Sequence, residues 1–249
     1  MGSELEGKVA LVTGASRGIG KAMAAAFADA GAAVMLTSRK QDALDAAADE
    51  IRAATPGARL ATFAANAGEE DQAQACVDAT MGELGAVDVL VNNAATNPYA
   101  GPVIETDLAA WDKTFRVNLR GFLVWTQAAW RAWQRDHGGR VINISSVGGI
   151  AGTGGLGTYN VTKAGVIHLT KILAAELAPG ITVNCIAPGL VKTDFARVLW
   201  EPLGQAADDL VQPEDIAAAA VYLAGPGGAR VTGHTLVVDG GSLIHQRSI

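Results

Sequence analysis

Three side chains whose spacing suits proton transfer stand in the second half of the sequence: Tyr159, Lys163 and Ser146. Tyr159 and Lys163 lie four residues apart in the run TYNVTKAG, and positions i and i+4 share one face of a helix. Because a nearby ammonium favours the phenolate, we expect Tyr159 to act as a general acid or base at a carbonyl or alcohol oxygen. Ser146 ends the apolar run VINISS, where its hydroxyl can hold the same oxygen. The neighbouring Ser145 is the alternative candidate for this hydroxyl.

A glycine-rich loop near the N-terminus has the residue types of a dinucleotide site. The loop TGASRGIG follows an apolar run and opens a segment of helical period. Glycine there permits a tight turn and close approach of the backbone to a pyrophosphate. The helix N-terminus offers free N–H groups to the phosphates. The residues expected to bind are Gly14, Ser16, Arg17, Gly18, Ile19 and Gly20.

The end of the second apolar run indicates which dinucleotide this is. Folds specific for NAD place a carboxylate there, to accept hydrogen bonds from the ribose. This chain has Ser38, Arg39 and Lys40 instead, and the first acid is Asp42. Arginine and lysine pair with a 2′-phosphate, and Arg17 of the glycine loop lies on the same side. We therefore predict NADP(H); the alternative is a solvated cluster of surface charges.

The alternation of segments predicts the fold. Short, continuously apolar runs alternate with longer segments of helical period, which is typical of βαβ units in a parallel sheet. The expected architecture is an α/β, single-domain, doubly wound Rossmann fold of about seven parallel strands with helices on both faces. One catalytic domain should span 1–249, with a lid-like substrate segment at about 189–212. Strands are expected at 8–13, 33–37, 59–64, 87–92, 140–145, 181–187 and 235–239. Helices are expected at 18–30, 41–54, 69–84, 107–137 (broken), 157–178 and 213–224.

Composition excludes several classes of function. Hydrophobic residues make up 49% of the 249 residues and charged residues 18%, as in a globular enzyme. A net charge of −6 argues against nucleic-acid binding, and no apolar run reaches the ~18 residues of a membrane span. The start has no secretory leader, and Cys76 and Cys185 form no disulfide or metal pattern, so a cytoplasmic location is expected. The four histidines are scattered, so no metal is expected.

These motifs together resemble the short-chain dehydrogenase/reductase family, in its shorter single-domain branch. The resemblance covers roughly residues 7 to 241. It includes the glycine spacing Gly-x-x-x-Gly-x-Gly, the Tyr-x-x-x-Lys pair, the run NNAA after the fourth strand, VNLRG, Pro188-Gly189 with Thr193, and the closing VTGHTLVVDGG. One departure is Ala95, where the family usually has glycine.

The resemblance implies further roles. Asn118 would help to connect Lys163 through water to solvent, and Lys163 would also bind the nicotinamide ribose. Other cofactor contacts implied are Asn66 and Ala67 near the adenine, Asn93 and Ala94 along the nucleoside, Val191 and Thr193 at the carboxamide, and Tyr159, Pro188 and Gly189.

The expected activity is NADPH-dependent reduction of a ketone or aldehyde to an alcohol. A small, hydrophobic substrate would enter past 96–99, 148–155 and 195–200, and the motifs resemble carbonyl reductases and 3-oxoacyl-carrier-protein reductases. Alternatives are an alcohol or hydroxysteroid dehydrogenase working oxidatively, and a 3-oxoacyl-thioester reductase. A non-catalytic NADP-binding regulator would lack the Tyr/Lys pair, and a sugar-nucleotide epimerase would need a longer C-terminal region. The resemblance also implies a homotetramer or dimer joined through the helices at 107–137 and 157–178.

Overall fold

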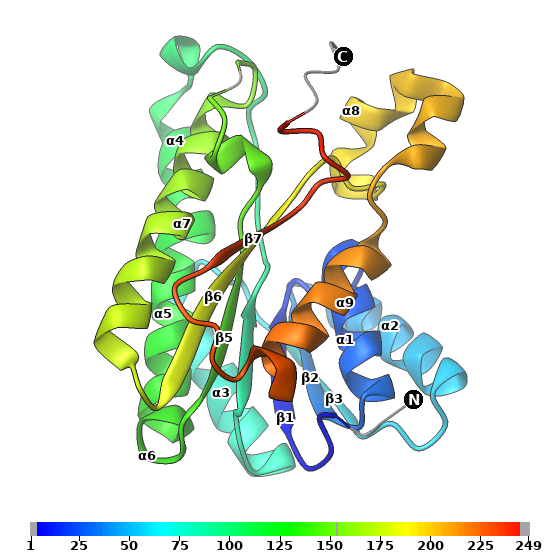
Figure 1. Ribbon diagram of the computed structural model, residues 1–249, viewed down its shortest axis with the longest axis vertical. Coiled ribbons are helices and arrows are strands. Elements are labelled where there is room, and N and C mark those ends of the chain that lie inside the picture. The colour runs from blue at the N-terminus through cyan, green and yellow to red at the C-terminus, as the bar shows by residue number, and fades with distance from the viewer. Residues whose placement is uncertain (1–3, 153, 245–249) are drawn as a thin grey trace.

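Seven strands form one parallel sheet in the computed structural model, which describes residues 4–152 and 154–244 (Figure 1). The strand order is β3-β2-β1-β4-β5-β6-β7. Every predicted strand is confirmed, with ends within two residues of the expected ones. Residues 1–3, 153 and 245–249 of the predicted domain, His245 among them, lie outside the described residues. The strands are β1 (Val9–Thr13), β2 (Ala33–Ser38), β3 (Leu60–Ala64), β4 (Val89–Asn92), β5 (Gly139–Ile144), β6 (Ile181–Pro188) and β7 (Thr235–Val238).

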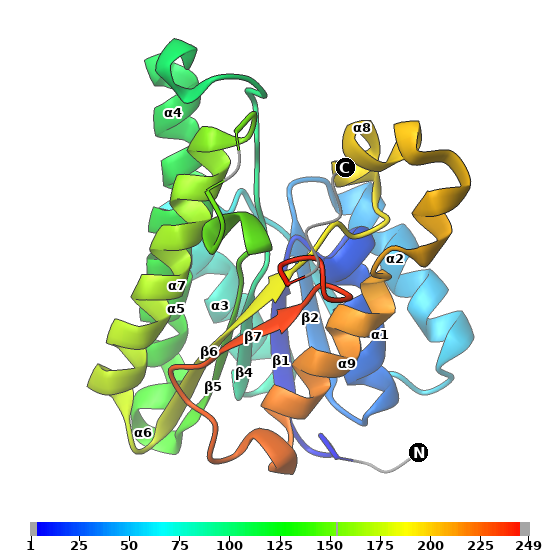
Figure 2. The same ribbon diagram turned by 45° about the horizontal axis from the view of Figure 1, so that its top comes forward.

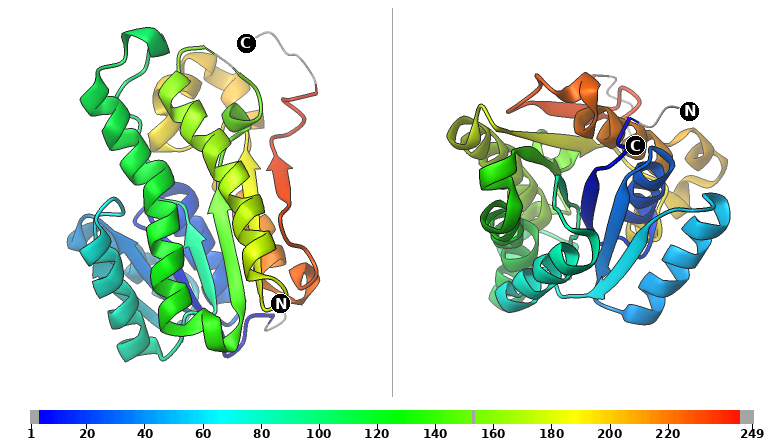
Figure 3. Two further views of the ribbon diagram at one scale, coloured as in Figure 1. Left: turned by 90° about the vertical axis from the view of Figure 1, so that its left-hand side faces the viewer. Right: turned by 90° about the horizontal axis from the view of Figure 1, so that it is seen from below.

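Helices cover both faces of the sheet, which confirms the doubly wound Rossmann architecture (Figure 3). One face packs against α1 (Gly18–Asp29), α2 (Gln41–Ala54) and α9 (Pro213–Ala224). The other packs against α3 (Glu70–Leu84), α5 (Gly121–Ala129) and α7 (Gly157–Leu177).

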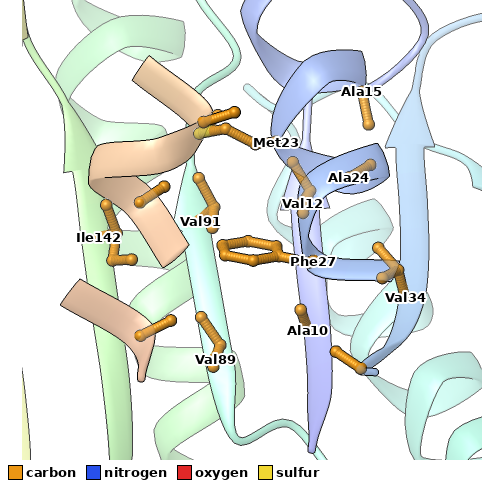
Figure 4. Close-up of a cluster of buried hydrophobic side chains, with 14 of the residues drawn as sticks. Ala10, Val12, Ala15, Met23, Ala24, Phe27, Val34, Val89, Val91 and Ile142 are labelled. Atoms are coloured by element: carbon orange, nitrogen blue, oxygen red, sulfur yellow. The ribbon is translucent and has the colours of Figure 1, made fainter. Parts of the chain in front are cut away.

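The first strand shows why the apolar runs are continuous. Successive side chains of a strand point to opposite faces, so Ala10 and Val12 enter the core under α1, while Val9 and Leu11 enter the core on the other face. In the first of these cores the Phe27 ring of α1 lies over the sheet, among the side chains of β1 and β4 (Figure 4). Full burial of such a ring stabilises the fold by roughly 1.5–3 kcal/mol.

The sequence led us to expect a break in the long helix before β5. The structure shows a continuous helix there instead. It begins at Asp107, whose carboxylate accepts a hydrogen bond from the Ala110 N–H at 3.2 Å. After α4 (Leu108–Phe115) come a π-helical turn at Arg116–Arg120, then α5, a second π-helical turn at Trp130–Gln134, and α6 (Arg135–His137). The flanking residues keep right-handed helical φ and ψ angles. An extra residue in each of the two turns therefore widens the helix without interrupting it.

A buried polar layer ties the sheet to two helices. Asn92 and Asn143 are paired in register on β4 and β5, and the Asn92 amide donates to Oδ1 of Asn143 at 2.9 Å. Asn92 also donates to the Thr126 hydroxyl of α5 at 3.1 Å, and Asn143 donates to the Thr170 hydroxyl of α7 at 2.9 Å. All four side chains are buried. These bonds fix α5 and α7 against the strands just below the edge where β4 and β5 end.

The sheet order places a binding edge between β1 and β4. The chain winds outward in one direction from β1 through β3 and in the other from β4 to β7. Open α/β sheets bind ligands at such a switch point, beyond the carboxyl ends of the strands. Above this edge α4 and the start of α7 rise on one side, and α8 (Arg197–Trp200) rises on the other (Figure 2).

Candidate active site

Tyr159 and Lys163 lie one helical turn apart near the start of α7, as predicted. The Lys163 side chain is 1% exposed, and its Nζ donates a hydrogen bond to the Ile144 carbonyl at 2.7 Å, at the end of β5. Nζ lies 5.4 Å from the centroid of the Tyr159 ring and 5.2 Å from that of Phe122. The phenol and the ammonium therefore lie side by side at the carboxyl edge of the sheet.

Ser146 and Ser145 have different partners. The Ser146 side chain forms a hydrogen bond with Tyr159, and its oxygen also accepts from the Gly148 N–H at 3.1 Å. Ser145 is buried and donates to the Lys163 carbonyl at 2.8 Å. Ser145 thus holds α7 against β5, while Ser146 is the hydroxyl placed beside the phenol.

The pKa values of the pair differ from the simple expectation. Burial raises the pKa of Tyr159 to about 12, although its hydrogen bond with Ser146 works in the other direction. Burial lowers the pKa of Lys163 to about 8. The sequence led us to expect an eased ionisation of the phenol, and this is wrong for the protein alone. Loss of hydration outweighs the ammonium, which is directed towards the Ile144 carbonyl. At neutral pH the structure holds a protonated phenol beside a charged lysine.

Asn118 lies fully buried in the first π-helical turn. Its Oδ1 accepts from the Thr96 N–H at 2.8 Å, and its Nδ2 donates to the Thr96 carbonyl at 2.9 Å and to the Thr162 hydroxyl at 3.3 Å. The side chain therefore fastens the loop after β4 to the helix and to α7. Its suggested link from Lys163 through water to solvent stays a prediction.

The glycine loop has the shape that a dinucleotide requires. Gly14 and Gly18 have φ angles of +67° and +54°, which favour glycine. A Cβ at Gly20 would stand 2.2 Å from the Gly14 carbonyl oxygen, so the helix start can approach the loop only without a side chain. Arg17 precedes α1, and no side chain caps that helix. The open N-terminus of α1, reached through a loop of bare backbone, fits a pyrophosphate group.

The cations expected to hold a 2′-phosphate lie in the glycine loop and directly after β2. Arg17, Arg39 and Lys40 are exposed, and within 4–152 and 154–244 none of them is in an ion pair. Ser38 is half-buried at the last position of β2. The Ala15 N–H donates to the Thr37 carbonyl at 3.0 Å and joins this strand end to the glycine loop.

The predicted nucleoside contacts include residues that shape the loop itself. The Asn93 amide donates to the carbonyls of Thr13 and Gly14, at 2.8 and 3.3 Å. The Thr13 hydroxyl accepts from the N–H groups of Asn93 and Ala94, at 2.9 and 3.1 Å. Thr13 is a supporting residue that we did not single out from the sequence, although its position directly before the first glycine of the loop was a usable signal.

The residues expected near the adenine lie after β3. The side-chain oxygen of Asn66 accepts from the Gly68 N–H at 3.2 Å, and the backbone N–H of Asn66 donates to the side-chain oxygen of Gln72 at 2.7 Å. The Ala67 carbonyl accepts from the indole of Trp125 at 3.2 Å. These contacts order the turn; adenine binding by it stays a prediction.

The segment after β6 runs beside the site. Pro188 ends β6, and Gly189 packs so closely on Asp239 that a Cβ would be 2.9 Å from its Cα. Val191 is buried, Thr193 lies against Gly18, and the Phe195 ring lies 6.3 Å from that of Tyr159. The predicted catalytic and cofactor residues thus gather at one edge of the sheet, while their roles remain predictions.

Comparison with known proteins places this geometry in a family. A family model described as "Enoyl-(Acyl carrier protein) reductase" matches residues 14–242. The chain is 37% identical to "Dehydrogenase/reductase SDR family member 4" of Sus scrofa, over 96% of this chain and 88% of that protein. It is 35% identical to "Tropinone reductase-like 3" of Erythroxylum coca, over 97% of this chain and 95% of that protein.

Solved structures agree with this placement. Levodione reductase superposes with a TM-score of 0.90 at 29% identity, covering 96% of this chain and 98% of that one. A 7α-hydroxysteroid dehydrogenase, in complex with NADH and 7-oxo glycochenodeoxycholic acid, superposes with a TM-score of 0.89 at 32% identity, covering 96% and 95%. The chain belongs to the short-chain dehydrogenase/reductase family and is an oxidoreductase that acts on CH–OH and C=O groups, with a nicotinamide dinucleotide as cofactor.

The described residues contain neither a candidate membrane span nor a candidate metal site. None of their helices is both long and apolar enough to cross a bilayer. No three of their His, Cys, Asp or Glu side chains gather as a metal site would need.

Proposed function

We propose that the protein is an NADPH-dependent reductase that converts a ketone or aldehyde to an alcohol, with Tyr159 as general acid. The observation that carries this proposal is the half-buried phenol of Tyr159, hydrogen-bonded to Ser146 and adjacent to the Lys163 ammonium. With a pKa raised to about 12, the phenol is protonated at neutral pH and can donate. Proton donation is what carbonyl reduction requires of it.

The residues divide the chemistry among them. When bound, the nicotinamide dinucleotide supplies the hydride. The Ser146 hydroxyl donates a hydrogen bond to the substrate oxygen and stabilises the charge that develops there. Tyr159 gives its phenolic proton to that oxygen, because a phenolate is a weaker base than an alkoxide. The Lys163 ammonium, 5.4 Å from the ring centroid, then stabilises the phenolate that remains. Asn118 keeps the neighbouring loop in place through its three hydrogen bonds.

The preference for NADPH over NADH is supported by charge. Arg17, Arg39 and Lys40 are exposed cations around the glycine loop and the end of β2, with no acidic partner in the described part of the chain. A 2′-phosphate would give them one. The hydroxysteroid dehydrogenase compared above binds NADH, so the cofactor must be tested for this chain. We expect kcat/KM to be at least tenfold higher with NADPH than with NADH. Arg39→Ala should reduce this ratio of the two kcat/KM values. Equal kcat/KM for both cofactors in the wild type would refute the phosphate clamp.

The activity is tested with a panel of carbonyl compounds, followed by NADPH absorbance. The panel contains aromatic ketones, diketones, retinal and a 3-oxoacyl thioester. In Tyr159→Phe we expect turnover to fall by at least 100-fold, while NADPH still binds. Turnover near the wild-type level in that variant would contradict the assignment of the acid.

The second candidate is an alcohol or hydroxysteroid dehydrogenase working in the oxidative direction. The similarity to a structure that contains an oxidised bile acid favours it. Initial rates with 7α-hydroxysteroids and NADP⁺, compared with the reverse reaction, distinguish the two candidates.

Three broader expectations complete the proposal. We expect one domain with a lid-like segment at 189–212, which borders the site through Thr193 and Phe195. We expect copies to associate as a tetramer or dimer through the long helices at 107–137 and 157–178; a monomeric mass by light scattering would refute this. A cytoplasmic location suits Cys76 and Cys185, which are buried free thiols.

A further inference from the structure

The short stretch of residues 193–195 touches both halves of the site. Thr193 lies against the glycine loop, since a Cβ built on Gly18 would be 3.3 Å from Thr193 Cγ2. Two residues later, the Phe195 ring lies 6.3 Å from the ring of Tyr159, at an interplanar angle of 45°. That separation is within the range of direct aromatic contact. The position of this stretch therefore affects both the dinucleotide loop and the phenol.

The core of the protein does little to hold this stretch in place. Phe195 and Val198 are 50% and 77% exposed. At the base of the segment, Val191 pairs with Val211, and the Lys192 N–H donates to the Val211 carbonyl at 3.1 Å. Beyond that pairing the chain consists of short helical turns, which are weak without tertiary contacts.

Trp200 supplies such a contact. Its indole N–H donates to the Thr193 carbonyl at 2.7 Å. The same carbonyl accepts from the Ala196 N–H at 3.1 Å, and the Lys192 ammonium lies 5.9 Å from the centroid of the indole ring. The indole thereby closes a loop of chain that begins at Thr193 and carries Phe195.

We propose that Trp200 is a positioning residue: its indole N–H fixes residues 193–195 across the glycine loop and the Tyr159 ring. Trp200 acts through Thr193 and Phe195. The inference rests on the proposed function only where it is tested by kcat/KM for a ketone. Cofactor binding and local backbone order report on it without turnover.

The first test is Trp200→Phe, which keeps an aromatic ring and removes the N–H donor. We expect the Kd for NADPH, measured by calorimetry, to rise roughly two- to tenfold, the effect of losing one neutral hydrogen bond. Amide hydrogen exchange of residues 193–200 should accelerate, while the urea midpoint stays at the wild-type value because the segment is largely exposed. Trp130→Phe, on the second π-helical turn, is the matched control and should change neither the affinity for NADPH nor the exchange of residues 193–200. Trp200→His, which keeps a ring N–H, should restore part of the affinity.

The second test is a double-mutant cycle on kcat/KM for a ketone that the wild type reduces. If Trp200 acts by positioning Phe195, the loss caused by Trp200→Phe should be smaller in a Phe195→Ala background. Additive losses, or an unchanged Kd together with unchanged exchange in Trp200→Phe, would overturn the proposal. A wild-type protein that binds NADPH and reduces no carbonyl compound would refute the proposed function, and the binding and exchange results would still decide the role of Trp200.

Discussion

Replacing Lys163 with methionine should abolish catalysis without destabilising the protein at neutral pH. Burial lowers the pKa of Lys163 from 10.5 to about 8, so the folded state disfavours the charged side chain. The unfolded chain therefore holds the proton more tightly than the folded protein does. At about 1.4 kcal/mol per pH unit, this difference costs the folded state about 3 kcal/mol below pH 8. The cost fades as the pH rises from 8 towards 10.5, because the lysine becomes neutral in both states.

Methionine has a similar length and no charge, so Lys163→Met removes this cost. The substitution also takes the donor from the Ile144 carbonyl, which costs about 1–3 kcal/mol. At pH 7 we therefore expect the free energy of unfolding of the variant to exceed that of the wild type by about 0–2 kcal/mol. Between pH 7 and 9.5 the wild type should gain about 2 kcal/mol relative to the variant.

The assay is urea unfolding of both proteins at pH 7 and 9.5, at one protein concentration, followed by circular dichroism. Lys171→Met is the matched control, because Lys171 lies exposed on the same helix; its difference from the wild type should not change with pH. A difference between Lys163→Met and the wild type that stays constant across the two pH values would refute the burial argument. A variant that is several kcal/mol less stable at both would show that Lys163 stabilises the fold through its contacts.

Three more outcomes follow from the same contacts. In the wild type, kcat/KM for reduction should fall above about pH 8, because the Lys163 ammonium is present only below its lowered pKa, and a flat profile to pH 10 would contradict this. Ser146→Ala should reduce kcat by about 100-fold or more with little change in urea midpoint, whereas Ser145→Ala, which breaks a buried hydrogen bond, should cost about 1–3 kcal/mol of stability in urea unfolding. Gly20→Ala should lose about 1–3 kcal/mol in the same assay because its methyl group would overlap a carbonyl oxygen, while Gly82→Ala, with open space in α3, should not lose stability.

The sheet was predictable because its inner strands β1, β4 and β6 are buried on both faces, so the sequence of each is a continuous apolar run with a sharp boundary. The gathering of Tyr159, Lys163 and Ser146 was predictable for a related reason. A helical spacing of four residues fixes the first two on one face, and the end of an apolar run places the third at the carboxyl edge of the sheet.

Other features could not be read from the sequence. The π-helical turn around Asn118 is flanked by residues with ordinary right-handed helical dihedral angles, and its sequence carries no glycine or proline that would mark a change of helix type. The raised pKa of Tyr159 depends on how much water the fold removes, and spacing gives only the distance to the nearest charge. Nothing in the sequence indicated that the Asn93 amide donates to the carbonyls of Thr13 and Gly14; its contact with the nucleoside stays a prediction. Which of several possible hydrogen-bond partners a side chain takes depends on the tertiary structure, and spacing along the sequence does not specify it.

The layer of paired amides and hydroxyls under the site has a consequence for how this enzyme can diverge. Apolar side chains can slide over one another at little cost, but Asn92, Asn143 and Thr170 bond only in one alignment. A shift of α7 along its axis would break that alignment and move Tyr159 with it. New substrate preferences are therefore most accessible through changes at the rim, at positions of 97–107 and 201–212 that make no contact with the glycine loop, Asn118 or Tyr159.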